Sequence, residues 1–181
     1  MEYRELKFEE IDQIWSIDRT EYVHSVYRRI GNGLKEKIIE TMIEGWPSRE
    51  AEINDPILKD CFRRGGFLFG AFDKETLKAV VVIDPKWRGK DMKTLELRFL
   101  YVDKNYRREG VGKFLFNKAV EKARALGANR LYISSSESKN TVEFYRSLGC
   151  ELVSEVDWEL FALEPKDIHM ELDLDRLVEN G

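Results

Sequence analysis

The stretch of sequence that most constrains the fold is residues 107–112 (RREGVG), which join a strand-like run to a helix-like run. The preceding run, residues 95–102, is apolar at most positions, which is typical of a buried strand. In the following run, apolar residues recur at helical spacing, at Val111, Phe114, Leu115, Ala119, Ala123 and Leu126. The pattern predicts a strand, a turn and a long helix that begins at the glycines.

The residues at this turn suit the binding of an anion. Glycine has no Cβ, so the backbone at Gly110 and Gly112 can approach another molecule closely. The first turn of a helix offers free N–H groups and a partial positive charge, which favour a pyrophosphate. Arg107, Arg108 and Lys113 add cationic donors. The alternative is an ordinary helix N-terminus with a solvated basic rim.

Two better-known phosphate loops do not fit this stretch. The Walker pattern would need glycine at Arg107 and serine or threonine at Phe114. The Rossmann fingerprint would need a third glycine at Leu115. The remaining pattern, R-x-x-G-x-G, resembles the coenzyme A signature of the GNAT superfamily, the acyl-CoA-dependent N-acetyltransferases.

A second motif strengthens the resemblance. In GNAT proteins an Asn often follows the strand after the glycine helix, and a Tyr five residues later lies in a short helix that ends at Gly. Asn140, Tyr145 and Gly149 match this pattern. The resemblance covers nearly the whole chain and leaves out only residues 173–181. It implies one α/β domain over residues 1–181, with a mixed, mostly antiparallel sheet, splayed central strands and flanking helices.

Periodicity and turn residues predict the other elements. We expect a strand–helix–strand crossover around the glycine turn, and Asn140, with Glu143 three residues on, is interpreted as a helix cap. The predicted strands are residues 3–8, 66–72, 77–83, 95–102, 130–135, 151–161 and 168–172. The predicted helices are residues 9–18, 34–43, 56–62, 110–126 and 140–148, and residues 86–93 are predicted to form a charged loop.

By this resemblance, an acyl-CoA would lie where the 95–102 strand separates from its neighbour. The backbone of Leu100 and Val102 would pair with the pantetheine arm like an added strand, and the Leu100 N–H would point at the thioester oxygen. The amides of residues 108–113 would hold the pyrophosphate, Asn140 would touch the pantetheine, and Phe144 and Arg146 would flank the cofactor. The complete expected set is Leu100, Tyr101, Val102, Arg107, Arg108, Glu109, Gly110, Val111, Gly112, Lys113, Asn140, Phe144, Tyr145 and Arg146.

The resemblance also implies that Tyr145 supplies a proton to the leaving thiolate. A phenol suits this role because its pKa, about 10, exceeds that of a thiol, so it is still protonated at neutral pH. The other interpretation is a core residue, because Tyr145 shares an apolar face with Val142 and Leu148.

Glu96 is the candidate general base that removes the proton from the substrate ammonium. It lies 11 residues before Arg107, which matches the position of the catalytic glutamate in the histone-acetylating members. Arg98 could hold its carboxylate ionised. Many members of the superfamily use a water chain or another acid instead, and Asp157 and Glu159 are the alternatives in this chain.

In this superfamily the first two helices and the strands near the C-terminus form the substrate wall, here roughly residues 16–46 and 154–168. Carboxylates beside aromatic rings suit a cationic amine, although a solvated acidic helix over core aromatics fits as well. Arg19, Arg28 and Arg29 would equally suit an anionic substrate. The acidic and aromatic residues of the wall are Asp18, Glu21, Tyr22, Tyr27, Trp46, Asp157, Trp158 and Glu159.

Composition limits the class of protein. The chain has 30 basic and 34 acidic residues and a formal net charge of −4, which argues against nucleic-acid binding. Cys61 and Cys150 are too few for a disulfide framework, which suits a reducing cytoplasm, and no apolar run is as long as a membrane span. We expect a cytoplasmic N-acetyltransferase that uses acetyl-CoA and an amine without a metal, with a homodimer as one possible assembly. The alternatives are a non-catalytic acyl-CoA-binding module and a transferase for a longer acyl group.

Overall fold

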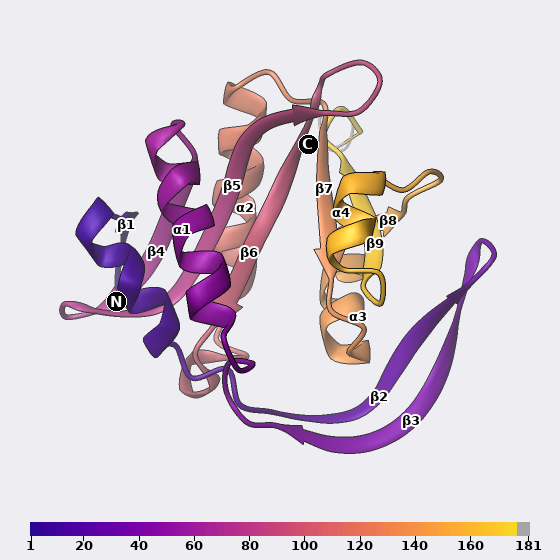
Figure 1. Cartoon of the computed structure of the whole chain (residues 1–181), viewed down its shortest axis with the longest axis horizontal. Coiled ribbons are helices and arrows are strands. Elements are labelled where there is room, and N and C mark those ends of the chain that lie inside the picture. Colours follow the sequence, from indigo (N-terminus) through magenta and orange to yellow (C-terminus); the bar gives the residue numbers. More distant parts are fainter. Residues whose placement is uncertain (177–181) are drawn as a thin grey trace.

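The computed structural model describes residues 1–176 and has the mixed α/β fold that the sequence predicts. Seven strands form one sheet in the order β1-β4-β5-β6-β7-β9-β8, and β2 and β3 form a separate hairpin (Figure 1). The strands are β1 (Glu2–Glu5), β2 (Glu21–Ile30), β3 (Gly33–Ile43), β4 (Phe67–Asp73), β5 (Thr76–Arg88), β6 (Thr94–Val102), β7 (Arg130–Ser135), β8 (Glu151–Leu152) and β9 (Ile168–Asp173). The helices are η1 (Phe8–Ser16), α1 (Glu50–Arg63), η2 (Lys104–Tyr106), α2 (Val111–Ala125), α3 (Lys139–Ser147) and α4 (Trp158–Leu163).

The crossover around the glycine turn is present as expected. β6 and β7 are parallel neighbours and α2 connects them, whereas the other neighbouring strands of this sheet pair in antiparallel fashion. A parallel pair needs a long crossover connection, and α2 provides it. The turn at residues 107–110 therefore lies at the end of β6, where the strand leaves the sheet.

Helices cover both faces of the sheet. On one face, Leu115 of α2 and Val142 of α3 belong to one buried cluster with Leu131 of β7. On the other face, η1 and α1 contribute Ile14 and Leu58 to a second cluster. None of the helices within residues 1–176 combines the length and the apolar content that crossing a membrane requires.

The predicted helix at residues 34–43 is wrong, because this segment is strand β3 of the hairpin. Ile30 and Gly33 pair across a two-residue turn of Gly31 and Asn32, a type of turn that favours a tight hairpin. The β-branched residues of β3 agree with a strand, although the spacing of Leu34 and Ile38 is also helical. The hairpin extends from the η1 side of the molecule and crosses beneath α3 (Figure 1).

Three further boundaries differ from the prediction. Pro56 does not open its helix: α1 begins at Glu50, and the proline lies inside it. Residues 86–88 belong to β5 rather than to a loop, so Arg88 lies in a strand. The predicted strand at residues 151–161 is wrong beyond Leu152, because the Asp157 side chain caps α4.

Candidate active site

The glycine turn has the backbone conformation that its sequence demands. Gly110 is the N-cap of α2 with φ +82°, a left-handed conformation that glycine adopts without strain. α2 begins at Val111, so the helix start predicted from the sequence is confirmed. A Cβ at Gly112 would lie 3.5 Å from Phe144 Cζ and 3.5 Å from Val102 Cγ2. The turn thus brings the end of β6, the start of α2 and α3 together.

The three predicted cations differ in their surroundings. Arg107 is committed to the protein: its Nε donates to the Val102 carbonyl (2.9 Å) and its Nη1 to the Thr20 carbonyl (3.0 Å). Arg108 and Lys113 are exposed and form no ion pair with any residue that the structure describes. Arg108 and Lys113 are therefore available for an anion, whereas Arg107 fixes the turn to β6. Glu109 is also exposed.

β6 separates from β7 directly beside this turn. The two strands pair from Thr94 with Arg130 to Leu97 with Ile133, and no pair is found between them beyond Leu97 in the described chain. Ser134 and Ser135 of β7 pair with β9 alone. β6 and β7 accordingly diverge toward the glycine turn in Figure 1.

The free edge of β6 presents the amides of two predicted residues. The Asp103 N–H donates to the Lys78 carbonyl (2.8 Å), so Asp103 directs its backbone groups to β5. Successive residues of a strand direct their backbone N–H and C=O groups to opposite edges. The N–H and C=O groups of Leu100 and Val102 therefore face the gap beside β7. Their side chains pack on the α2 face. This arrangement fits an extended ligand that pairs with β6.

A β-bulge in β6 determines which face of the sheet the side chains near this gap occupy. Val82 pairs with Phe99 and Ile83 with Leu97, so Arg98 is the extra residue. Bulges re-aim the side chains that follow them. Leu97 therefore lies on the α2 face, while Phe99 and Tyr101 pack on the η1 face.

The second motif lies on α3, beside the glycine turn. The predicted capping role of Asn140 is wrong: the N-cap is Ser138, and Asn140 Nδ2 instead donates to Glu21 of β2 (3.2 Å). Phe144 lies against Gly112, and Arg146 is exposed and pairs with Glu143 (3.1 Å). α3 therefore joins the turn to the hairpin.

Tyr145 is buried, and its ring lies 6.0 Å from that of Phe116 and 5.2 Å from that of Phe144. No hydrogen bond to its hydroxyl is found within residues 1–176. Burial raises the pKa of Tyr145 well above its usual value, so the phenol is protonated at neutral pH. Tyr145 is thus a core residue that carries a protonated hydroxyl, and its two predicted interpretations do not exclude each other.

Glu96 lies on the opposite face of the sheet from α2, buried between two arginines. Its Oε2 lies 3.2 Å from Arg88 Nη2, and Arg98 Nη1 lies 3.3 Å from both carboxylate oxygens. Burial raises the pKa of Glu96 above its usual value, although the charges of Arg98 and Arg88 oppose the shift. The contact with Arg98 was predictable from the sequence, whereas Arg88 was missed because it fell in a predicted loop.

The predicted substrate wall is mostly engaged within the protein. Arg19 lies over the rings of Trp46 (4.9 Å) and Tyr101 (5.0 Å), and Trp158 is exposed. Asp167, which the sequence did not single out, is half-buried, and burial raises its pKa to about 7. The other contacts are Asp18 with Lys104, Glu21 with Asn140, Tyr27 with Glu143, Arg28 with Glu137, Arg29 with the Val153 carbonyl, and Asp157 and Glu159 with Arg88. Tyr22 is exposed on the hairpin.

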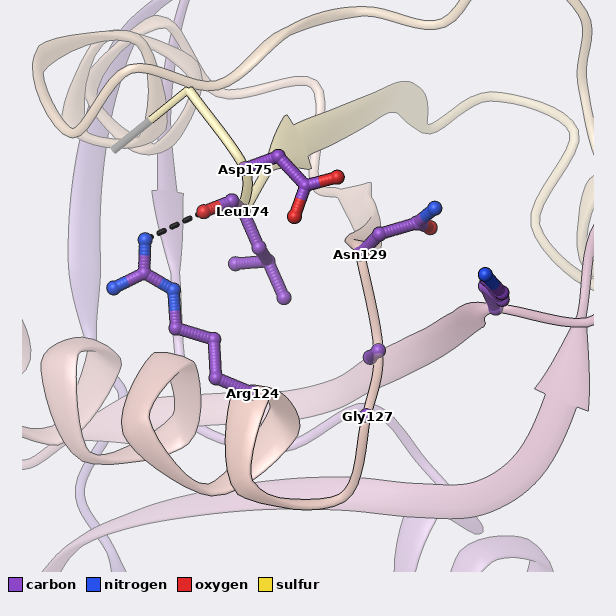
Figure 2. Close-up of a pocket in the computed structure, with 7 residues that line it drawn as sticks. Arg124, Gly127, Asn129, Leu174 and Asp175 are labelled. Carbon is purple, nitrogen blue, oxygen red and sulfur yellow. Dashed lines mark hydrogen bonds between the residues drawn. The ribbon is translucent and has the colours of Figure 1, made fainter. Parts of the chain in front are cut away.

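Two hollows lie away from the glycine turn. Figure 2 shows the first, where Arg124 donates to the Leu174 carbonyl beside Gly127 and Asn129. It adjoins the C-terminal end of α2, a helix of 15 residues, and is therefore about 20 Å from Gly110. The second, of about 440 Å³, lies between the hairpin and the α4–β9 segment and includes Asp167. Within residues 1–176, no cluster of His, Cys, Asp or Glu has the arrangement of a metal site.

Comparisons with known proteins bear on the family and on the fold. Residues 22–150 match the model of the acetyltransferase (GNAT) family. Nourseothricin acetyltransferase has a TM-score of 0.71 at 20% identity, over 96% of this chain and 98% of that one. A streptothricin acetyltransferase homologue from Bacillus anthracis, solved with acetyl coenzyme A, has a TM-score of 0.70 at 17% identity, over 95% and 97%. PaiA N-acetyltransferase from Thermoplasma acidophilum, solved with coenzyme A, has a TM-score of 0.63 at 18% identity, over 95% and 98%.

Proposed function

This chain belongs to the acetyltransferase (GNAT) family, and from that premise we propose that it transfers the acetyl group of acetyl-CoA to a primary amine in a ternary complex. One observation carries the proposal: the free edge of β6 lies directly beside the glycine turn. An open strand edge fits the amides of a pantetheine arm, and the adjoining helix N-terminus fits a pyrophosphate.

The residues around the gap fit acetyl-CoA. The backbone of Leu100 and Val102 would pair with the pantetheine, and the N–H groups from Arg108 to Lys113 would hold the pyrophosphate, with Arg108 and Lys113 adding charge. Asn140, Phe144 and Arg146 on α3 would line the other side of the gap. Acetyl-CoA would supply an activated acyl group, and the Leu100 N–H would stabilise the charge that develops on the acyl oxygen.

The two faces of the sheet would then have different tasks. Tyr145, on the α2 face, would donate its proton to the thiolate. Glu96, on the α1 face, would take the proton from the amine, directly or through water. A thiol ester on the protein is disfavoured, because burial raises the pKa of Cys61 and of Cys150 to about 12, so neither thiol is an effective nucleophile.

A panel of amines tested with acetyl-CoA, succinyl-CoA and a longer acyl-CoA, with thiol release as the readout, tests this proposal. The panel should include diamines, amino acids and peptides, because both cationic and anionic groups surround the acceptor side. We expect acetyl transfer to at least one primary amine and not to its N-acetylated form. Tight acetyl-CoA binding without transfer to any amine would instead favour a binding module, and preference for the longer thioester would change the acyl group.

A further inference from the structure

One buried guanidinium, that of Arg88, contacts three carboxylates. Its Nη2 lies 3.2 Å from Glu96 Oε2, and its Nη1 lies 3.1 Å from Asp157 Oδ2 and 3.4 Å from Glu159 Oε2. The Arg88 side chain is 5% exposed, so water cannot easily replace these contacts. The candidate base and both of its alternatives thus share the same cation.

Arg88 reaches this position because β5 is irregular. Asp84 pairs with Glu96, and Arg88 pairs with Thr94. Four steps along β5 therefore correspond to only two steps along β6, so β5 contains extra residues here. The extra residues include Pro85, which cannot donate to the strand ladder. Such a bulge redirects the side chain that follows it, and here it turns Arg88 toward Glu96.

Asp157 is held in place without any help from Glu96. Its Oδ1 accepts from the N–H groups of Glu159 (3.0 Å) and Leu160 (3.1 Å) and so caps α4, which leaves Oδ2 for Arg88. Its own N–H donates to the Tyr132 hydroxyl (3.1 Å). The Tyr132 hydroxyl also lies 2.9 Å from His169 Nδ1. The anchor for Arg88 is therefore a hydrogen-bonded network across β7, β9 and α4.

We propose that Arg88 is a positioning residue that holds the Glu96 carboxylate and ties its charge to the first turn of α4; the inference rests on the proposed function, in which Glu96 is the base. When Glu96 takes up a proton, its attraction for Arg88 falls. Asp157 and Glu159 then keep the guanidinium in place. Glu96 therefore returns to the same geometry after each proton transfer.

Because Arg88 contacts three carboxylates, the other two also determine how strongly Arg88 favours the ionised form of Glu96. A guanidinium within about 4–6 Å lowers the pKa of a carboxyl group, and competing carboxylates weaken that effect. The other titratable groups near Glu96 are Arg98 on β6, Asp84 on β5, Tyr132 on β7 and the buried Cys61 on α1. Arg64 of α1 pairs with Asp84 (2.9 Å), so the negative charge of Asp84 is largely neutralised. Arg88 is therefore the partner of Glu96 whose effect depends on its other carboxylates.

Two substitutions should move the Glu96 pKa in opposite directions. Arg88→Met removes a cation and should raise it by about 1–3 pH units. Asp157→Asn removes a competitor and should lower it by about half a unit to one unit, and asparagine is an equally good helix N-cap. Arg88→Lys keeps the positive charge, so the Glu96 pKa should rise much less in this variant than in Arg88→Met. Lys90→Met, which breaks only the exposed pair with Glu155, is the control and should change nothing.

The measurement is a carboxyl ¹³C NMR titration of the full chain, with the Glu96 signal assigned by its loss in Glu96→Gln. Shifts of the same sign in Arg88→Met and Asp157→Asn, or no shift in either, would overturn the inference. If Arg88→Met does not fold, the downward shift in Asp157→Asn decides alone, and its absence is a refutation.

A second measurement tests whether the contact between Arg88 and Glu96 affects the reaction. The acid limb of kcat/KM against pH should move with the NMR pKa in each variant, because the base must be deprotonated to act. An acid limb that stays fixed while the NMR pKa moves would show that Glu96 is not the base, and it would overturn the proposed role of Glu96 on which the positioning role rests. A wild-type chain that acetylates no amine would count against the proposed function instead, since the NMR titration reads the Arg88 contact without turnover.

Discussion

Replacing Tyr145 with phenylalanine separates chemistry from packing. The substitution keeps the ring, which packs against Phe116 and Phe144, and removes a hydroxyl with no hydrogen bond within residues 1–176. Stability should therefore change by less than about 1 kcal/mol. If the hydroxyl protonates the thiolate, kcat should fall by about 10²-fold or more, with little change in acetyl-CoA affinity.

Tyr132→Phe is the matched control. The Tyr132 hydroxyl is buried and contacts His169 Nδ1 (2.9 Å) and the Asp157 N–H (3.1 Å). Removing it takes the acceptor from the Asp157 N–H and leaves His169 Nδ1 with the more distant Ser134 hydroxyl (3.4 Å). The loss should cost about 1–3 kcal/mol, or a fall in Tm of roughly 2–4 °C per kcal/mol. The assays are thermal unfolding and thiol release at saturating substrates. The reasoning would be refuted if Tyr145→Phe lost as much stability as Tyr132→Phe, or if it kept more than about a third of its rate while chemistry limits turnover.

Three other changes test separate parts of the account. Gly112→Glu should abolish acetyl-CoA binding in calorimetry, because it sets a carboxylate at the first turn of α2. Gly112→Ala, whose Cβ meets only ordinary contacts at 3.5 Å, should weaken binding much less. If the two variants bound acetyl-CoA with equal affinity, the pyrophosphate would have to bind elsewhere. Glu96→Gln should lower the rate at neutral pH by about 10²-fold and recover at high pH, where the free amine is already neutral; an unchanged profile with a raised amine KM would make Glu96 a binding group. Asp167→Asn should stabilise the protein at pH 8 but not at pH 4, by about 1 kcal/mol or more. Its folded pKa of about 7 lies above the unfolded value near 3.8, so the folded state binds the extra proton and stability falls as pH rises between them; equal unfolding free energies at pH 8 would contradict this.

The glycine turn and its helix were predictable because their signals are local. Gly110 needs a left-handed backbone, and the apolar face of α2 repeats at helical spacing. The β3 segment misled the prediction because Leu34 and Ile38 also fit a helical face, and its turn of Gly31 and Asn32 was the better signal. Tertiary context decided between them.

The surroundings of Glu96 could be predicted only in part. Arg98 is close in sequence, so its contact follows from the strand. A bulge in β5 brings Arg88 to Glu96, and the cap of α4 brings Asp157 to Arg88; neither feature has a periodic pattern. Long-range contacts of this kind depend on the packed sheet, which a single sequence does not reveal.

The most direct test of the central claim is an amide NMR titration of the full chain with coenzyme A. The account places the pantetheine along the free edge of β6 and the pyrophosphate at the start of α2. The largest shifts should therefore fall on Leu100, Val102 and the amides from Arg108 to Lys113, and Gly112→Glu should remove them. Shifts concentrated instead at the hollow of Arg124, Gly127 and Asn129, or no shifts at millimolar coenzyme A, would contradict it.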